Sequence, residues 1–169
     1  RLRKKFLDAN ERKKHSKSQN KSYIQIIILI ILAYANLVII SFLAATILPF
    51  SSEIFLSVMI LSKKYELGLL LFFASFGNIC GSIVNWYLGK KILIFQSKKW
   101  FPVNSNQLNK SQKIFNKYGS WSILFAWVPI IGDPITVLSG VLNVNFLKFV
   151  ILVTISKVSR YIFLIYLIN

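Results

Sequence analysis

The 169-residue sequence has one cysteine, Cys80, and one histidine, His15, which lies in a basic N-terminal segment. A single cysteine excludes a disulfide within the chain, and the pair of residues is too small a set for a Cys/His metal cluster. The sequence also lacks a nucleophile elbow, a Gly-rich phosphate loop and a multi-Asp metal motif. We therefore expect no enzyme activity, no metal and no cofactor.

Acidic residues are scarce as well: five Asp or Glu stand against 21 Lys or Arg, in a chain that is 55% hydrophobic. The mean hydropathy is +0.59, whereas soluble domains are about 45–50% apolar with glycine included. One membrane crossing takes about 20 residues. The composition predicts an all-α polytopic membrane protein with a handful of transmembrane helices.

Residues 1–21 carry nine Lys or Arg against Asp8 and Glu11. We expect a disordered cytoplasmic tail that attracts anionic lipid headgroups, so membrane lipids are the expected partners. No folded nucleic-acid reader accompanies this charge, and we expect no nucleic acid partner. The sequence starts at Arg1 rather than Met, which leaves its true start open. The sequence also leaves open whether the protein forms homo-oligomers.

Three apolar runs, residues 22–48, 67–89 and 146–168, are long enough to cross a bilayer. They predict a single membrane domain over residues 22–168. Two other apolar pieces are short and interrupted by proline, which forbids one continuous helix. We expect them to form re-entrant helical hairpins at about residues 42–62 and 120–144. A weak apolar stripe predicts an interfacial helix at about residues 106–118, ended by Gly119.

Basic residues predict the orientation of these segments. Nine lie in the tail and seven lie between residues 90 and 117, and both regions should be cytoplasmic. The chain would then be multi-pass with a cytoplasmic N-terminus. The two hairpins would enter from opposite sides and meet tip to tip near the bilayer midplane.

The two predicted hairpin tips share a pattern. The first reads "PFSSE" and the second "PIIGD", each a proline, three residues and an acid, and each is followed by a short apolar arm. With opposite entry sides, this pattern favours an inverted repeat with helix ends at mid-membrane. The residues assigned to the tips are Pro49, Ser52, Glu53, Pro129, Gly132, Asp133 and Pro134.

Charged residues at membrane depth are the candidate functional residues. Glu53 and Asp133 lie at the two tips, and Lys157 and Arg160 lie three apart in the last apolar run. A charge at the bilayer centre costs at least ~2.5–3.5 kcal/mol, so we expect the acids and bases to pair. Two interpretations stay open for the acids. Asp133 before Pro134 suits an N-cap and Glu53 a first helical turn, or both acids also act on a substrate, an ion or a proton.

A ridge of small or polar residues runs along the second apolar run. Gly77, Gly81, Asn85 and Gly89 recur every four residues, which lets another helix approach closely. Asn78 and Asn85 can also donate hydrogen bonds across such an interface. We expect this ridge to serve helix packing.

The segments "FLAATILPFSSE", "GNICGSIVNWYLG", "KYGSW", "WVPIIGDP" and "SKVSRY" occur in an order that resembles YqaA-type proteins. These are short bacterial members of the DedA family, also called SNARE-associated Golgi or VTT-domain proteins. The resemblance covers about residues 41–161. It implies a protein of the bacterial cytoplasmic (inner) membrane with two facing re-entrant hairpins and functional acids at Glu53 and Asp133. The chain lacks the second-hairpin arginines of broader DedA proteins, and has Ser156 where its YqaA-type relatives usually have glycine.

This resemblance implies a lipid or lipid-phosphate translocase that works like a transporter or scramblase. Lys157 and Arg160 would hold a phosphate, while Glu53 and Asp133 would exchange protons. One alternative is a proton-coupled transporter of small solutes. Another is a non-catalytic structural or membrane-homeostasis protein, in which the hairpins only pack and the tail recruits partners or lipid.

Overall fold

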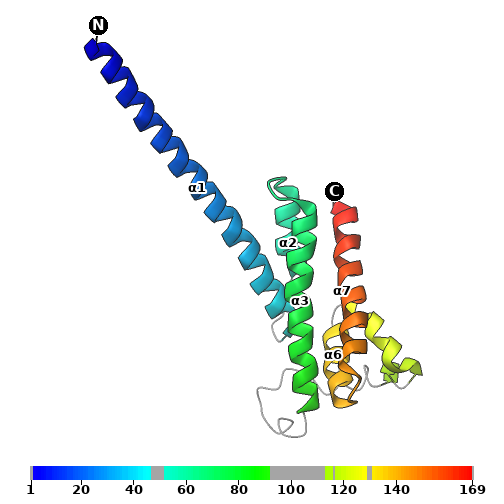
Figure 1. Cartoon of the computed structure of the whole chain (residues 1–169). Coiled ribbons are helices and arrows are strands. Elements are labelled where there is room, and N and C mark those ends of the chain that lie inside the picture. The colour runs from blue at the N-terminus through cyan, green and yellow to red at the C-terminus, as the bar shows by residue number, and fades with distance from the viewer. Residues whose placement is uncertain (1, 47–51, 92–112, 116, 129–130, 169) are drawn as a thin grey trace. The chain divides into compact units, whose positions relative to one another are not determined.

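The computed structural model describes residues 2–46, 52–91, 113–115, 117–128 and 131–168, with the backbone alone for residues 2–18. All regular secondary structure in these residues is helical, as the composition predicts (Figure 1). The elements are the α-helices α1 (Leu2–Thr46), α2 (Ser52–Leu61), α3 (Leu67–Lys90), α6 (Gly132–Val141) and α7 (Phe146–Ile168), and the 3₁₀ helix η1 (Gly119–Trp127).

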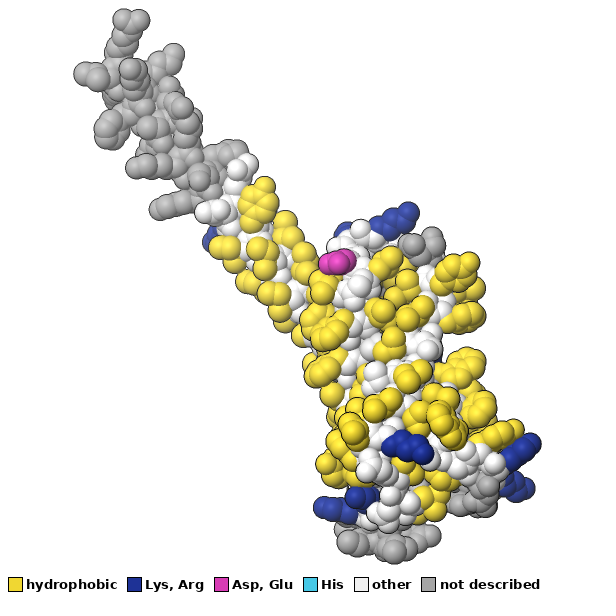
Figure 2. Space-filling model, turned by 45° about the vertical axis from the view of Figure 1, so that its right-hand side comes forward, with side chains coloured by type: hydrophobic (Ala, Val, Ile, Leu, Met, Phe, Trp, Pro, Cys, Tyr) yellow, Lys and Arg dark blue, Asp and Glu magenta, His cyan; other side chains and the backbone are white. Residues whose placement is uncertain are grey.

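Within the described residues, three helical stretches are long and apolar enough to cross a membrane: Gln19–Thr46, Leu67–Lys90 and Phe146–Ile168. They agree within a few residues with the runs predicted from hydropathy. Large apolar side chains stay exposed along all three, as expected for helices whose solvent is lipid. Figure 2 shows hydrophobic side chains over the middle of the 36–169 unit, with basic side chains toward its two ends.

The chain divides into two compact units, residues 1–35 and 36–169, and α1 passes through both. The tail that we expected to be disordered is helical from Leu2 onward, so that expectation is corrected. The physical reason is that no glycine or proline occurs before Pro49. Lys, Arg, Gln, Glu and Ala, which dominate the tail, are all good helix formers.

The short helices α2 and α6 resemble each other. Each has ten residues, with an acid in the second position, Glu53 in α2 and Asp133 in α6. Each ends two residues before a residue in the left-handed region, Lys63 (φ 52°) and Asn143 (φ 51°). A long helix follows in both cases, α3 after α2 and α7 after α6 (Figure 1).

Several predicted segments differ from the structure or fall outside it. Residues 42–46 continue α1, so the first arm of the first predicted hairpin is not a separate helix. The first arm of the second is the 3₁₀ helix η1. Most of the predicted interfacial helix at 106–118 lies outside the described residues, as do Pro49 and Pro129, although 113–115 and 117–118 are helical. Gly119 after it has φ 59°, in agreement with a glycine that ends a helix.

The predicted ridge on α3 packs against two different helices. A methyl group built on Gly81 would lie 2.6 Å from the carbonyl oxygen of Phe42 in α1, and one on Gly77 would overlap that of Val38. At the other end of α3, a methyl group on Gly89 would overlap the carbonyl oxygen of Val137 in α6. The ridge thus lets α1 and α6 approach the α3 backbone closely.

Candidate functional site

The two acids and two bases form two pairs of opposite charge, and both bases lie in the middle of α7. Lys157 Nζ lies 3.1 Å from Asp133 Oδ1 at the start of α6. Arg160 pairs with Glu53 Oε1 at the start of α2. Since each acid occupies the first turn of its helix, it also faces the positive end of the helix dipole. The expectation that two acids and two bases neutralise each other is therefore confirmed.

The two ion pairs differ in how far they are buried. The Lys157 side chain is 1% exposed, while that of its partner Asp133 is 41% exposed. The Arg160 and Glu53 side chains are 20% and 26% exposed. Lys157 is thus enclosed behind its acid, whereas both members of the Arg160–Glu53 pair can be reached from outside.

The predicted capping role of Asp133 is wrong. Helix α6 begins at Gly132, so Asp133 is its second residue and Pro134 its third, and the N-cap residue Ile131 makes no side-chain cap hydrogen bond. The helix starts early because the Gly132 amide donates to the carbonyl of Val128 at 2.9 Å. Pro134 removes no bond there, since the first four amides of a helix have no intrahelical partner. The Asp133 carboxylate is left to Lys157.

Asn78 of α3 is joined to α7 directly, and to α2 through Tyr161, beside the Arg160–Glu53 pair. Its side-chain amide donates to the Tyr161 hydroxyl at 2.8 Å. The Ser52 hydroxyl shares a hydrogen bond with the same oxygen at 3.0 Å. Ser52, Asn78 and Tyr161 are all buried. Ser52, the residue before Glu53, is therefore bonded to α7 and, through the Tyr161 hydroxyl, linked to α3, which fixes the start of α2.

Asn85 lies two turns further along α3, and it joins α3 to α1 and α6 beside the Asp133–Lys157 pair. Its amide donates to the carbonyl of Ala45 in α1 at 2.7 Å and to the Thr136 hydroxyl in α6 at 3.1 Å. Thr136 in turn donates to the backbone carbonyl of Asp133 at 2.6 Å. One face of α3 thus holds the first turns of both short helices.

Sequence reasoning missed two residues of this site, Thr136 and Tyr161, and noted Ser156 without giving it a contact. Tyr161 follows Lys157 by four residues, a spacing that puts both on one helix face, and this signal was available. Ser156 donates to the carbonyl of Leu124 in η1 at 3.0 Å, a contact that glycine at this position does not make. Thr136 gave no distinct signal, because a threonine within an apolar helix is common.

Polar atoms without a partner lie inside the helix packing. Among the described residues, five buried side-chain N or O atoms have no hydrogen bond: Ser41 Oγ, Ser75 Oγ, Asn78 Oδ1, Asn85 Oδ1 and Trp86 Nε1. Most buried polar groups in proteins are satisfied. The two asparagine oxygens therefore leave unused acceptor capacity next to both ion pairs.

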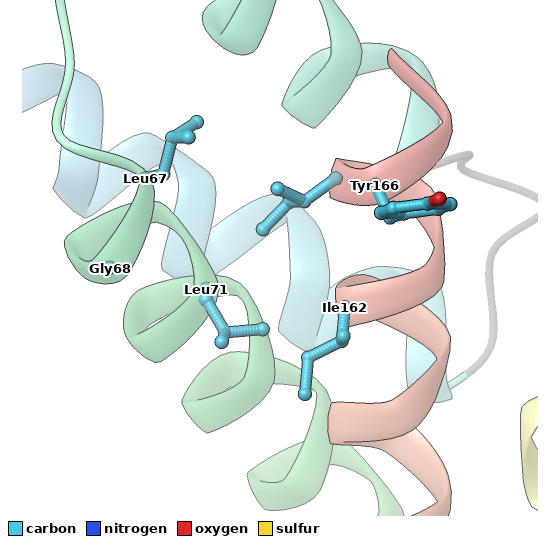
Figure 3. Close-up of a pocket in the computed structure, with 6 residues that line it drawn as sticks. Leu67, Gly68, Leu71, Ile162 and Tyr166 are labelled. Atoms are coloured by element: carbon cyan, nitrogen blue, oxygen red, sulfur yellow. The ribbon is translucent and has the colours of Figure 1, made fainter. Parts of the chain in front are cut away.

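An apolar groove of about 450 Å³ lies between the first turns of α3 and the last turns of α7 (Figure 3). It is lined by Leu67, Gly68, Leu71, Ile162, Ile165 and Tyr166. None of the described residues that line this groove is charged, and none belongs to the two ion pairs.

Comparison with known proteins gives the family. The VTT domain matches residues 48–169. The chain is 29% identical over 122 residues to the inner membrane protein YqaA of Escherichia coli, which is 72% of this chain and 81% of that protein. It is 27% identical over 135 residues to an uncharacterized protein of Haemophilus influenzae (75% of this chain, 82% of that one). It is also 27% identical over 136 residues to the uncharacterized protein RP436 of Rickettsia prowazekii (80% and 96%).

No solved structure matches the chain. The VTT domain match includes both acids, both bases and the short helices α2 and α6. It also covers more than half of the sequence. The chain therefore belongs to the VTT domain family and is a DedA-type membrane protein.

Proposed function

We propose that this protein translocates lipids or lipid phosphates across the bacterial inner membrane. The observation that carries the proposal is that both short helices start with an acid that pairs with a base in the middle of α7. Charged groups within spanning helices are costly and typically mark a transport path or a binding site. If these four residues only held the helices together, uncharged residues would do so at a lower desolvation cost.

We further propose that α2 and α6 are the second arms of two re-entrant hairpins related by an inverted repeat. The support is their common length, the acid in their second position and the left-handed residue after each end. They run toward opposite ends of α3: α2 leads into its start, while Val137 of α6 contacts Gly89 near its end. Two half-helices that start at mid-membrane shorten the path that a polar headgroup must cross.

In the proposed cycle, a lipid phosphate competes with an acid for its base. Protonation of the Glu53 carboxylate removes its charge and releases the Arg160 guanidinium, which can then bind a phosphate oxyanion by two parallel hydrogen bonds. Loss of that proton restores the ion pair and expels the phosphate. Arg160 is the more accessible base, since Lys157 is 1% exposed. We assign Asp133 and Lys157 the same exchange at the second hairpin.

The experiment is lipid movement in liposomes reconstituted with the full chain. A fluorescent phospholipid and then a polyprenyl phosphate are followed as they become accessible on the opposite leaflet. We expect movement in the wild type and its loss in Glu53→Gln/Asp133→Asn, which keeps side chains of the same size. The matched control is Glu66→Gln, an acid just before α3 that belongs to neither of the two ion pairs, which should move lipid at the wild-type rate.

Helicity measured by circular dichroism separates loss of function from loss of fold. A folded double variant that still moves both lipids would refute the role of the acids. A folded wild type that moves neither lipid would refute translocation of these substrates. Solute uptake driven by a pH gradient would then favour the small-solute transporter, and the absence of both activities would favour a structural role.

A further inference from the structure

We propose that one end of the membrane domain binds anionic phospholipid headgroups through a set of exposed lysines. This lysine end consists of Lys90, Lys91, Lys113, Lys117 and Lys148, all exposed. It is distinct from the basic tail of residues 1–21 and from the ion pairs of α7. The inference does not depend on lipid translocation.

The lysines come from separate elements that meet at this end. Lys90 and Lys91 close α3, and Lys148 lies in the first turn of α7. The rings of Trp86 and Phe146, with centroids 5.1 Å apart, join the end of α3 to the start of α7. Lys148 Nζ lies 5.8 Å from the ring centroid of Trp121 in η1, so η1 reaches the same end. Figure 2 shows basic side chains there.

No acid balances these lysines. The sequence has no Asp or Glu between Glu66 and Asp133, and none after Asp133. Asp133 itself is paired with Lys157. The opposite end differs, because Lys63 and Lys64 there are followed by Glu66. Like charges gathered without a counter-charge are retained where the partner is negative, and a leaflet rich in anionic lipids attracts each basic residue close to its surface.

Aromatic rings hold three of the lysines in place. Lys90 Nζ lies 4.3 Å from the Trp86 centroid and Lys117 Nζ 5.2 Å from that of Tyr118, in addition to Lys148 over Trp121. An ammonium group over a ring face keeps donors free on its other side. Trp121 and Tyr118 are themselves 63% and 46% exposed, and exposed Trp and Tyr favour the headgroup level of a bilayer.

A phosphate headgroup fits this arrangement better than another protein surface does. The helices that reach this end expose large apolar side chains along their length, so we expect the lysines to lie at the boundary between hydrocarbon and water. A phospholipid meets both parts at once, with its chains along the apolar flank and its phosphate at the ammonium groups. A zwitterionic headgroup is attracted less strongly to the lysines, because its own cationic group lies beside the phosphate.

The test measures lipid selectivity at the protein surface by electron spin resonance. The full chain is reconstituted in bilayers with spin-labelled phosphatidylglycerol or phosphatidylcholine, and the motionally restricted fraction gives the ratio of their association constants. We expect phosphatidylglycerol to be favoured several-fold in the wild type. Lys90→Gln/Lys148→Gln should bring the ratio most of the way to one, because a basic residue near such a surface contributes up to a factor of about five.

The matched control is Lys63→Gln/Lys64→Gln, which removes the same charge from the opposite end and should leave most of the ratio unchanged. Both variants keep the basic tail, so its contribution is common to them. In 1 M salt, where the Debye length is about 3 Å, the selectivity should nearly vanish. Equal association of the two lipids with the wild type would overturn the proposal, and so would an equal effect of the two double variants.

Discussion

At the residue scale, the buried Lys157 ammonium depends on one carboxylate. Its side chain is 1% exposed and Asp133 Oδ1 lies 3.1 Å away, so Asp133→Leu would leave a buried charge without its partner. We expect this change to lower the free energy of unfolding by about 3 kcal/mol. Asp133→Leu/Lys157→Met should recover most of that loss, because neither charge then remains. The measurement is loss of helicity against the mole fraction of sodium dodecyl sulfate.

If the losses of unfolding free energy in Asp133→Leu and Lys157→Met simply added up in the double variant, the two side chains would not be coupled, and this prediction would be contradicted. Transport assays need Asp133→Asn instead, because asparagine keeps an oxygen that accepts a hydrogen bond from Lys157.

At this scale the sequence predicted which residues would pair but not how. Two acids and two bases in apolar segments are enough to predict neutral pairs, since unpaired charges at that depth are too costly. The assignment of Glu53 to Arg160 and Asp133 to Lys157 depends on where α2 and α6 meet α7. The hydrogen bonds of Ser52 with Tyr161 and of Thr136 with Asn85 depend on the same placement. Local sequence carries no direct signal for it.

At the scale of elements, the contact between α3 and α6 is made backbone to backbone. A methyl group on Gly89 would overlap the carbonyl oxygen of Val137, and one on Gly140 would overlap that of Trp86. We therefore expect Gly89→Ala to lower the free energy of unfolding by about 3 kcal/mol, since the helices must separate. Denaturation in sodium dodecyl sulfate, followed by circular dichroism, measures the change.

Gly68→Ala in the same helix is the matched control. A methyl group there would lie 3.6 Å from the nearest atom around it, Glu66 Oε1, which is ordinary contact. Alanine favours helix by up to about 1 kcal/mol over glycine, so this variant should be as stable as the wild type or slightly more so. If Gly89→Ala behaved in the same way, the close approach of α6 to α3 would be wrong.

Hydropathy and the positions of proline predicted the long helices well. Helices α3 and α7 begin at the expected residues, because apolar runs of this length have one stable form in a membrane. The start of α6 was mispredicted, since Asp before Pro is a common helix start and the amide bond from Gly132 to Val128 is not visible in sequence. The 3₁₀ form of η1 has no distinct composition either.

At the scale of the whole molecule, the distribution of charge predicts which end of the 36–169 unit faces the cytoplasm. Helix α3 has 24 residues and a length of about 36 Å, enough to separate its two ends by a bilayer. Lys91 follows its last turn among lysines without acids, whereas Lys64 precedes its first turn beside Glu66. Excess Lys and Arg favour the cytoplasmic side, so Lys91 should lie in the cytoplasm and Lys64 outside.

Single-cysteine labelling tests this orientation directly. In a Cys80→Ala background, Lys91→Cys should react with a membrane-impermeant maleimide only in inside-out vesicles, and Lys64→Cys only in right-side-out vesicles. The parent chain is a control, because Cys80 lies in the middle of α3 and should react in neither. Labelling of both positions from one side would show that α3 does not cross the membrane. A reversed pattern would keep α3 as a span but turn the lysine end to the outer leaflet, where its expected anionic partner would have to be sought.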